Sequence, residues 1–198
     1  MTGGSIVTDV TVLTDANEPL HLLTVEDYHR MLDVGIINFR DKIELLDGVI
    51  FEMAAEGEPH VLAVSLLARW LNRGLEDERR MVRIAAPLTL PPFSQPEPDI
   101  ALADHPDSAE WHPERAHLLI EVSHSSLSKD RGRKARIYAE AGLPQYWIVD
   151  LVHKSVIVHL DPSPLGYLTI KTYTAPASLD PGLFGIPPLQ LELLFKTD

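Results

Sequence analysis

Three charged residues in the middle of the sequence have complementary chemistry: Asp99, Glu121 and Lys134. The two acids lie in short strand-like runs, Asp99–Ala103 and His117–Ser123, and the lysine follows on a helix-like segment. Two carboxylates can share a divalent cation, whose charge offsets their mutual repulsion. A lysine beside them can neutralise charge on a phosphoryl group or orient a water molecule. These residue types predict a metal-dependent phosphodiesterase.

Glu121 lies inside a markedly apolar run. Side chains of a strand alternate between its two faces, so Glu121 shares a face with Leu119 and Ser123, and the aliphatic residues between them point the other way. Burying this carboxylate without a partner would cost several kcal/mol, so a partner is expected. Two simpler interpretations remain open: Glu121 could reach solvent at a strand end, and Asp99 could be a turn or strand-entry residue.

Lys134 is expected to face inward. At 100° per residue it falls about 40° from Asp130, on the arc that also contains Ile137 and Ala141. The neighbouring arginines fall on the opposite side of the helix. This arrangement predicts a lysine that points at the sheet and pairs with Asp130 one turn earlier. The alternative is an exposed pair of the two residues.

Turn signals and periodicity predict the elements that must position these residues. Asp47-Gly48 between two β-prone runs is a strong hairpin signal, and apolar spacing of three and four residues marks helices. The prediction is an α/β fold with a mixed sheet flanked by helices and an N-terminal hairpin. A single domain, 21–198, follows an N-terminal arm, 1–20. The expected elements are helices 24–32 and 60–75, hairpins 42–53 and 146–160, strands 81–90, 99–103 and 117–123, and a helix ending near Gly142 and Pro144.

Composition limits the function classes. The chain has 198 residues, a net charge of −12, no cysteine and no long apolar segment or signal-peptide pattern, which predicts a cytoplasmic protein without disulfides. The acidic balance works against nonspecific nucleic-acid binding. Basic residues nevertheless gather in two segments, 69–83 and 129–136, which could meet a polyanion or could be solvated helix faces.

Other chemistries receive less support. The nine histidines do not form a helical zinc motif. His60, at the start of a predicted helix, is interpreted as a polar residue that marks the helix start rather than as a metal ligand. Ser123 and Ser125 are nucleophile types, but no Gly-x-Ser-x-Gly elbow surrounds them. The sequence also contains no phosphate-binding glycine loop.

Several motifs together resemble the Uma2 family, also called DUF820, of restriction endonuclease-like proteins. The resemblance runs from about Thr24 to Phe195, and the order and spacing of its motifs make it specific. It rests on Glu44-Leu45-Leu46-Asp47-Gly48, Pro98-Asp99-Ile100, Leu119-Ile120-Glu121-Val122-Ser123, Asp130 with Lys134 and Tyr138, and Ala141 to Asp150.

The resemblance implies a fold similar to that of PD-(D/E)xK nucleases and a set of site residues. Asp99 and Glu121 would bind the metal, Mg²⁺ or Mn²⁺, with the Val122 carbonyl as a further ligand and Glu44 as an auxiliary acid. The usual lysine two residues after the glutamate is replaced by serine in this chain, and Lys134 would take its place.

The function expected from the residues and the resemblance is a metal-dependent endonuclease acting on nucleic acid, with DNA as the expected substrate. Asp99 and Glu121 would hold the ion and Lys134 would orient water. A homodimer is expected by analogy, with the apolar C-terminal tail in its interface. The competing hypothesis is a nuclease fold without turnover that binds nucleic acid or protein.

Overall fold

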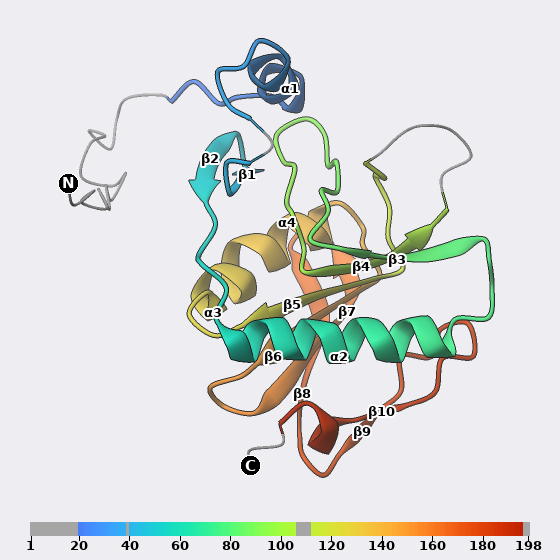
Figure 1. Ribbon diagram of the computed structural model, residues 1–198. Coiled ribbons are helices and arrows are strands. Elements are labelled where there is room, and N and C mark those ends of the chain that lie inside the picture. The colour runs from blue at the N-terminus through green and yellow to red at the C-terminus, as the bar shows by residue number, and fades with distance from the viewer. Residues whose placement is uncertain (1–19, 39, 106–111, 196–198) are drawn as a thin grey trace.

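A six-stranded mixed sheet forms the centre of the protein, in the order β3-β4-β5-β6-β7-β8 (Figure 1). The computed structural model describes residues 20–38, 40–105 and 112–195, so the predicted N-terminal arm lies outside it except for Leu20. All neighbouring strands are antiparallel except β5 and β6. The strands are β3 (Arg80–Ile84), β4 (Ile100–Asp104), β5 (Leu118–Ser123), β6 (Gln145–Asp150), β7 (Ser155–Ser163) and β8 (Gly166–Thr174).

The parallel step from β5 to β6 requires a crossover, because a tight turn can join only antiparallel strands. Three consecutive helical segments supply it, beginning four residues after β5 ends. They are α3 (Leu127–Lys129), the π-helical turn η2 (Asp130–Lys134) and α4 (Ala135–Glu140). Gly142, with a positive φ of 73°, follows the last of them, as the predicted helix end requires.

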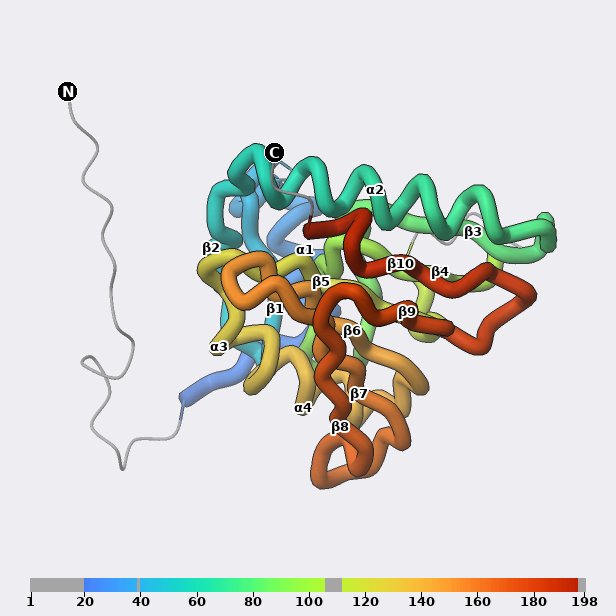
Figure 2. The backbone as a smooth tube through the Cα atoms, turned by 90° about the horizontal axis from the view of Figure 1, so that it is seen from below, coloured from blue at the N-terminus to red at the C-terminus, as the bar shows by residue number. Residues whose placement is uncertain are grey.

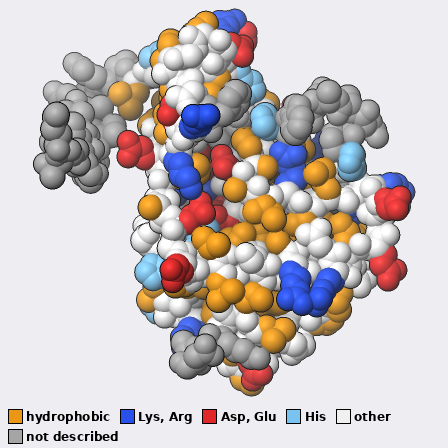
Figure 3. Space-filling view, viewed as in Figure 1, with side chains coloured by type: hydrophobic (Ala, Val, Ile, Leu, Met, Phe, Trp, Pro, Cys, Tyr) orange, Lys and Arg blue, Asp and Glu red, His pale blue; other side chains and the backbone are white. Residues whose placement is uncertain are grey.

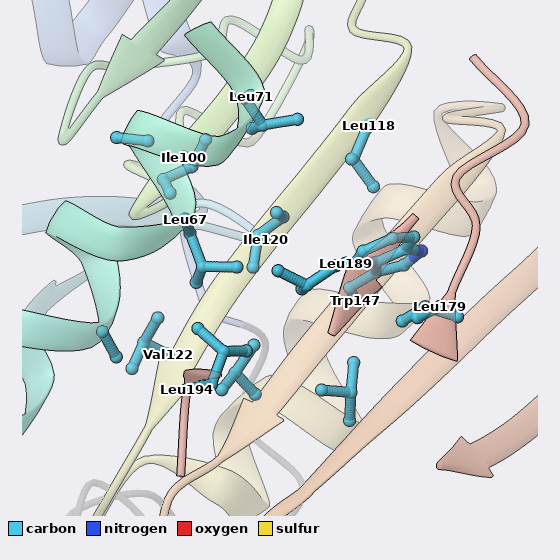
Figure 4. Packing of buried hydrophobic residues seen from close by; sticks show 14 of the residues in the cluster. Leu67, Leu71, Ile100, Leu118, Ile120, Val122, Trp147, Leu179, Leu189 and Leu194 are labelled. Atoms are coloured by element: carbon cyan, nitrogen blue, oxygen red, sulfur yellow. The ribbon is translucent and has the colours of Figure 1, made fainter. Parts of the chain in front are cut away.

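One face of the sheet is covered by α2 (Glu58–Gly74), and α3 and α4 lie on the opposite face (Figures 1 and 2). On the α2 face, Leu67 and Leu71 pack against Ile100, Ile120 and side chains from the central strands (Figure 4). On the α4 face, a second apolar cluster includes Tyr138, Tyr146 and Ile148. The predicted alternation in β5 is confirmed, because Leu119 belongs to the α4 cluster and Ile120 to the α2 cluster.

An N-terminal unit of one helix and one hairpin sits beside the main sheet. The helix α1 (Val25–Asp33) begins at Thr24, whose side chain and that of Asp27 form a reciprocal capping box. The hairpin pairs β1 (Ile43–Leu46) with β2 (Val49–Glu52) around Asp47 and Gly48, as predicted. Both turn residues have positive φ, which matches the Asp-Gly preference of such hairpins.

The predicted strand 81–90 is too long. Strand β3 ends at Ile84, because Ala85 adopts a left-handed φ of 43° that turns the chain out of the sheet. Leu88 and Leu90 then pack into the α4 cluster. The prediction of a strand is confirmed for the first part of this segment. The turn at Ala85 does not change the pattern of apolar residues, so the sequence gives no sign of where the strand ends.

The C-terminal tail completes the core. A two-stranded sheet joins β9 (Ser178–Leu179) to β10 (Leu189–Gln190), and the short 3₁₀ helix η3 (Leu191–Leu193) follows. Leu189, Leu191 and Leu194 are buried in the α2 cluster. These three side chains are therefore used within the chain, whereas Leu193 of the same tail is half exposed.

Candidate active site at the end of strands β4 and β5

Asp99 and Glu121 lie beside each other at one end of the central strands. Ile100 pairs with Ile120 in the antiparallel register of β4 and β5, which brings the preceding Asp99 next to Glu121. The backbone N–H of Val122 donates a hydrogen bond of 2.6 Å to Asp99 Oδ2. Asp99 does lie at the entry to β4, directly before Ile100, and its side chain is in addition tied to the strand that carries Glu121.

Lys134 is enclosed against Glu121 and Glu44. Its Nζ lies 2.8 Å from Glu121 Oε1 and 3.0 Å from Glu44 Oε2, and its side chain is only 4% exposed. Tyr138, one turn further along the helix, donates a second hydrogen bond of 2.9 Å to Glu121 Oε1. Burial of both Lys134 and Glu121 contradicts the interpretations in which they are solvent-exposed charges.

Glu44 reaches the same cluster from the N-terminal hairpin. Its Oε1 accepts a bond of 2.7 Å from Lys129 Nζ, and its Oε2 faces Lys134 and the backbone N–H of Glu97. Both carboxylate oxygens of Glu44 are thus engaged by protein donors, and its side chain is fully buried. This geometry suits a residue that holds two lysines in place better than it suits a metal ligand.

The predicted pairing of Asp130 with Lys134 is wrong. Asp130 Oδ2 instead accepts hydrogen bonds from the hydroxyls of Ser123 and Ser126, and no ion pair joins it to Lys134 within the described part of the chain. Both residues lie in the π turn η2, which is wider than an α-helical turn and rotates the chain less per residue, so a spacing of four no longer places the two side chains as it would in an α-helix. Tyr146 supports this turn by donating a hydrogen bond to the Asp130 carbonyl.

His60 belongs to the site, although the sequence predicts only a polar residue that marks a helix start. It lies near the start of α2, and its Nε2 is 3.1 Å from Asp99 Oδ2. Its other ring nitrogen, Nδ1, is buried without a hydrogen-bond partner among the described residues. The one available signal is its position at the predicted start of a helix, which is too general to identify a site residue.

These residues border one pocket of about 150 Å³. Acidic and basic side chains gather side by side between the N-terminal hairpin and α2 (Figure 3). The segment between β2 and α2 and the loop after β5 complete the walls. The charged and histidine residues that line the pocket are Glu44, Glu56, His60, Glu97, Asp99, Glu121, His124, Lys129, Asp130 and Lys134.

The ionisation of the cluster is set by burial and by close charges. Burial opposes the charge on Lys134, but the carboxylates of Glu121 and Glu44 outweigh it and raise its pKa. Burial also disfavours the charge on Glu44, but Lys134 and Lys129 lower its pKa overall. Lys134 is therefore a stable cation and Glu44 a stable anion near neutral pH.

Glu121 is ionised less readily. Its pKa is raised to about 8, mainly by burial and further by the charges of Asp99, Asp130 and Glu44, while the nearby charge of Lys134 works in the opposite direction. The hydrogen bond to Asp99 raises the pKa of His60, although burial works in the opposite direction. An added positive charge would favour the ionised form of Glu121, so the electrostatics of the pocket suit a bound cation.

The donor set fits magnesium or manganese coordinated partly by water. Among the described residues no group of three or more His, Cys, Asp or Glu side chains is arranged to enclose a metal ion. Magnesium, however, is commonly bound through one or two carboxylates, with water and substrate phosphate completing its shell. In the described structure Asp99 Oδ1 and Glu121 Oε2 receive no protein hydrogen bond, so one oxygen of each acid is available.

Within the described ranges, none of the helices combines the length and apolarity that a membrane span requires. None of the curated proteins compared with the chain matches it. A solved structure does match: the chain is similar to a crystal structure of "a putative nuclease belonging to DUF820" from Anabaena variabilis ATCC 29413. The similarity has a TM-score of 0.68 at 16% identity and covers 87% of this chain and 97% of the other.

The predicted fold class is confirmed by this structural similarity. A family model, Uma2, described as "Putative restriction endonuclease", matches residues 25–189. The matched range contains the hairpin that carries Glu44, the strand ends with Asp99 and Glu121, and the crossover with Lys134. The chain therefore belongs to the Uma2 family.

Proposed function

We propose that this protein is a nuclease that hydrolyses phosphodiester bonds with the help of Mg²⁺ or Mn²⁺. The observation that carries the proposal is the approach of two carboxylates, Asp99 and Glu121, and a buried ammonium, Lys134, to one pocket. Asp99 and Glu121 would hold the ion, together with the Val122 carbonyl. When bound, such an ion polarises the phosphate and lowers the pKa of a coordinated water.

Lys134 would act as a fixed positive charge. Two of its N–H groups face Glu121 and Glu44, which leaves one of three for a phosphate oxygen or a water molecule. Its raised pKa makes it a poor general base, so its role is to orient water and to stabilise charge that develops on the phosphoryl group. Glu44 would serve this role indirectly by fixing both Lys134 and Lys129.

The competing hypothesis is a binding module that kept the fold without turnover. The net charge of −12 favours it, since tight binding of nucleic acid normally needs a basic surface. Against it, a module without chemistry has no need to bury Glu44, Glu121 and Lys134 together, because apolar residues of similar volume would be as stable or more stable. We therefore favour the enzyme.

Metal binding is the first test. Calorimetric titration with Mn²⁺ should show binding to the wild type and strong weakening in Asp99→Asn and Glu121→Gln. Lys129→Gln, at the edge of the same cluster, serves as a control that changes charge without removing a proposed ligand. No binding at millimolar metal, or binding unchanged in Glu121→Gln, would contradict the proposed site.

Cleavage is the second test. Incubation of single- and double-stranded DNA and RNA with Mg²⁺ or Mn²⁺ should give products with the wild type and none with chelator. Lys134→Met should bind metal and lose cleavage, since it keeps the apolar stem and removes the charge. Metal-dependent cleavage at the wild-type rate in this variant would exclude the role given to Lys134.

The homodimer stays a prediction, although three leucines of the apolar tail are buried within the chain. Light scattering at several protein concentrations measures it directly. A mass of 22.1 kDa, that of one chain, at every concentration would contradict it.

A further inference from the structure

His60 is a histidine of the pocket wall with no role in the proposed chemistry so far. Its side chain is 13% exposed, and the Asp99 carboxylate is the one hydrogen-bond partner that the described residues give it. Burying Nδ1 without a partner is unfavourable, and a buried unsatisfied nitrogen in a native structure calls for a functional explanation. Among the described residues, the ring makes no hydrogen bond to a helix end or to the backbone that would give it a structural purpose there.

The contact has a definite consequence for Asp99. Its Oδ2 is held by two donors from two different elements: His60 Nε2 on α2 and the Val122 N–H on β5. Two donors on one oxygen fix the rotation of the carboxylate and leave Oδ1 free of protein donors in the described structure. An acid prepared in this way presents one defined oxygen to a cation.

Position along the chain supports the same role. Pro59 lies directly before His60 in the first turn of α2, where the fixed φ of proline suits the helix start. The 17-residue helix behind them is anchored in the apolar core by Leu67 and Leu71. The imidazole is therefore carried by a rigid element, as a residue that orients another must be.

We infer that His60 is a positioning residue that holds the Asp99 carboxylate in the orientation that binds the divalent cation, by donating a hydrogen bond from Nε2. This inference rests on the proposed metal site and assigns it an additional residue. Removing a partner that orients a metal ligand typically weakens metal binding about 10- to 100-fold. His60→Ala should show a loss of that order.

The test is a set of Mn²⁺ titrations by calorimetry. Glutamine can place its amide N–H where His60 Nε2 lies, and asparagine reaches only as far as Nδ1, so His60→Gln should recover most of the affinity and His60→Asn should not. In a double-mutant cycle, His60→Ala should cost far less in an Asp99→Ala background than in the wild type. His124→Ala removes another histidine from the exposed side of the pocket and should change little.

The outcomes separate this inference from the proposed function. If Asp99→Ala and Glu121→Gln bind Mn²⁺ much more weakly than the wild type while His60→Ala binds like it, His60 does not position Asp99, and the proposed metal site is unaffected. If glutamine fails to restore affinity, or the two substitutions are additive in the cycle, His60 acts otherwise than through Asp99. If the wild type binds no Mn²⁺, the result contradicts both the proposed metal site and this inference. Thermal unfolding of each variant establishes that the fold is intact.

Discussion

The two faces of the central sheet bury different kinds of side chain. The face under α2 is closed by a cluster of hydrophobic residues that includes Leu67, Ile120 and Trp147. The face under α4 is also largely apolar, but it encloses Glu121 and Lys134 beside the pocket. Burying apolar surface on the first face stabilises the fold directly, whereas burying charges on the second costs free energy that their mutual attraction recovers only in part.

Pairing of the charges allows the protein to keep such a cluster. Charges that are expensive to bury remain in place because each one has a partner: Lys134 lies between Glu121 and Glu44, and Lys129 closes the other side of Glu44. The apolar face gives the stability that tolerates this cost. Changes on the first face should therefore alter stability alone, and changes on the second should alter stability, chemistry and pH dependence together.

The largest effect is expected for Lys134→Ala. It leaves two buried carboxylates without their shared cation, which should reduce the free energy of unfolding by about 3–5 kcal/mol. Denaturant unfolding measures the loss. Replacing Lys134 by Met together with Glu121 by Leu should recover much of it without restoring cleavage, because an apolar pair can occupy the same volume. A single variant as stable as the wild type would mean that the cluster is well solvated.

Leu67→Ala tests the opposite face. Truncating this fully buried side chain should cost about 2–5 kcal/mol, through lost apolar burial and the cavity that remains. The variant should keep its affinity for Mn²⁺ under conditions in which it is folded. A large change in metal affinity at unchanged fold would show that the two faces are coupled and would break the comparison.

The stability of the face under α4 should also depend on pH through His159. Its ring is buried beside Tyr146 and Tyr167, and burial lowers its pKa from the usual 6.5. Below that value the unfolded chain binds a proton that the folded chain does not, so stability should fall by up to about 1.4 kcal/mol per pH unit until the lowered pKa is reached.

Denaturant unfolding between about pH 7.5 and 5.5 checks this titration, since the window spans the usual histidine pKa. His159→Phe keeps an aromatic ring and should show a smaller loss across the window. Leu67→Ala is the matched control, because it should shift stability by a similar amount at each pH. An equal loss in His159→Phe and the wild type would assign the pH dependence to other groups.

The smallest effect is expected for Glu140→Ala. Its ion pair with Arg136 is nearly half exposed on both sides, and Arg136 also contacts Asp47. Exposed pairs of this kind contribute about 0–1 kcal/mol, so the variant should unfold close to the wild type. The difference between the stability losses of Lys134→Ala and Glu140→Ala shows how much more a buried ion pair depends on both partners than an exposed pair does.

Local patterns were sufficient for most of the elements. The Asp47-Gly48 turn, the apolar spacing of α2 and the alternation in β5 each reflect geometry within a few residues, and each prediction is confirmed. The inward orientation of Lys134 also followed from helical spacing. The end of β3 is not predictable from local patterns, because it depends on the left-handed conformation of Ala85. Alanine rarely adopts this conformation, so the residue type gives no sign of it.

The sequence by itself determined that Asp99, Glu121 and Lys134 have the chemistry for the site and that Lys134 faces inward, because residue type and periodicity are local properties. Only the tertiary structure decided their partners. His60 and Asp99 are 39 residues apart, and Lys129 and Glu44 are 85 apart, so no local pattern links them. The π turn decided that Asp130 bonds to serines rather than to Lys134. Such contacts follow from how distant elements pack, and packing depends on the whole chain.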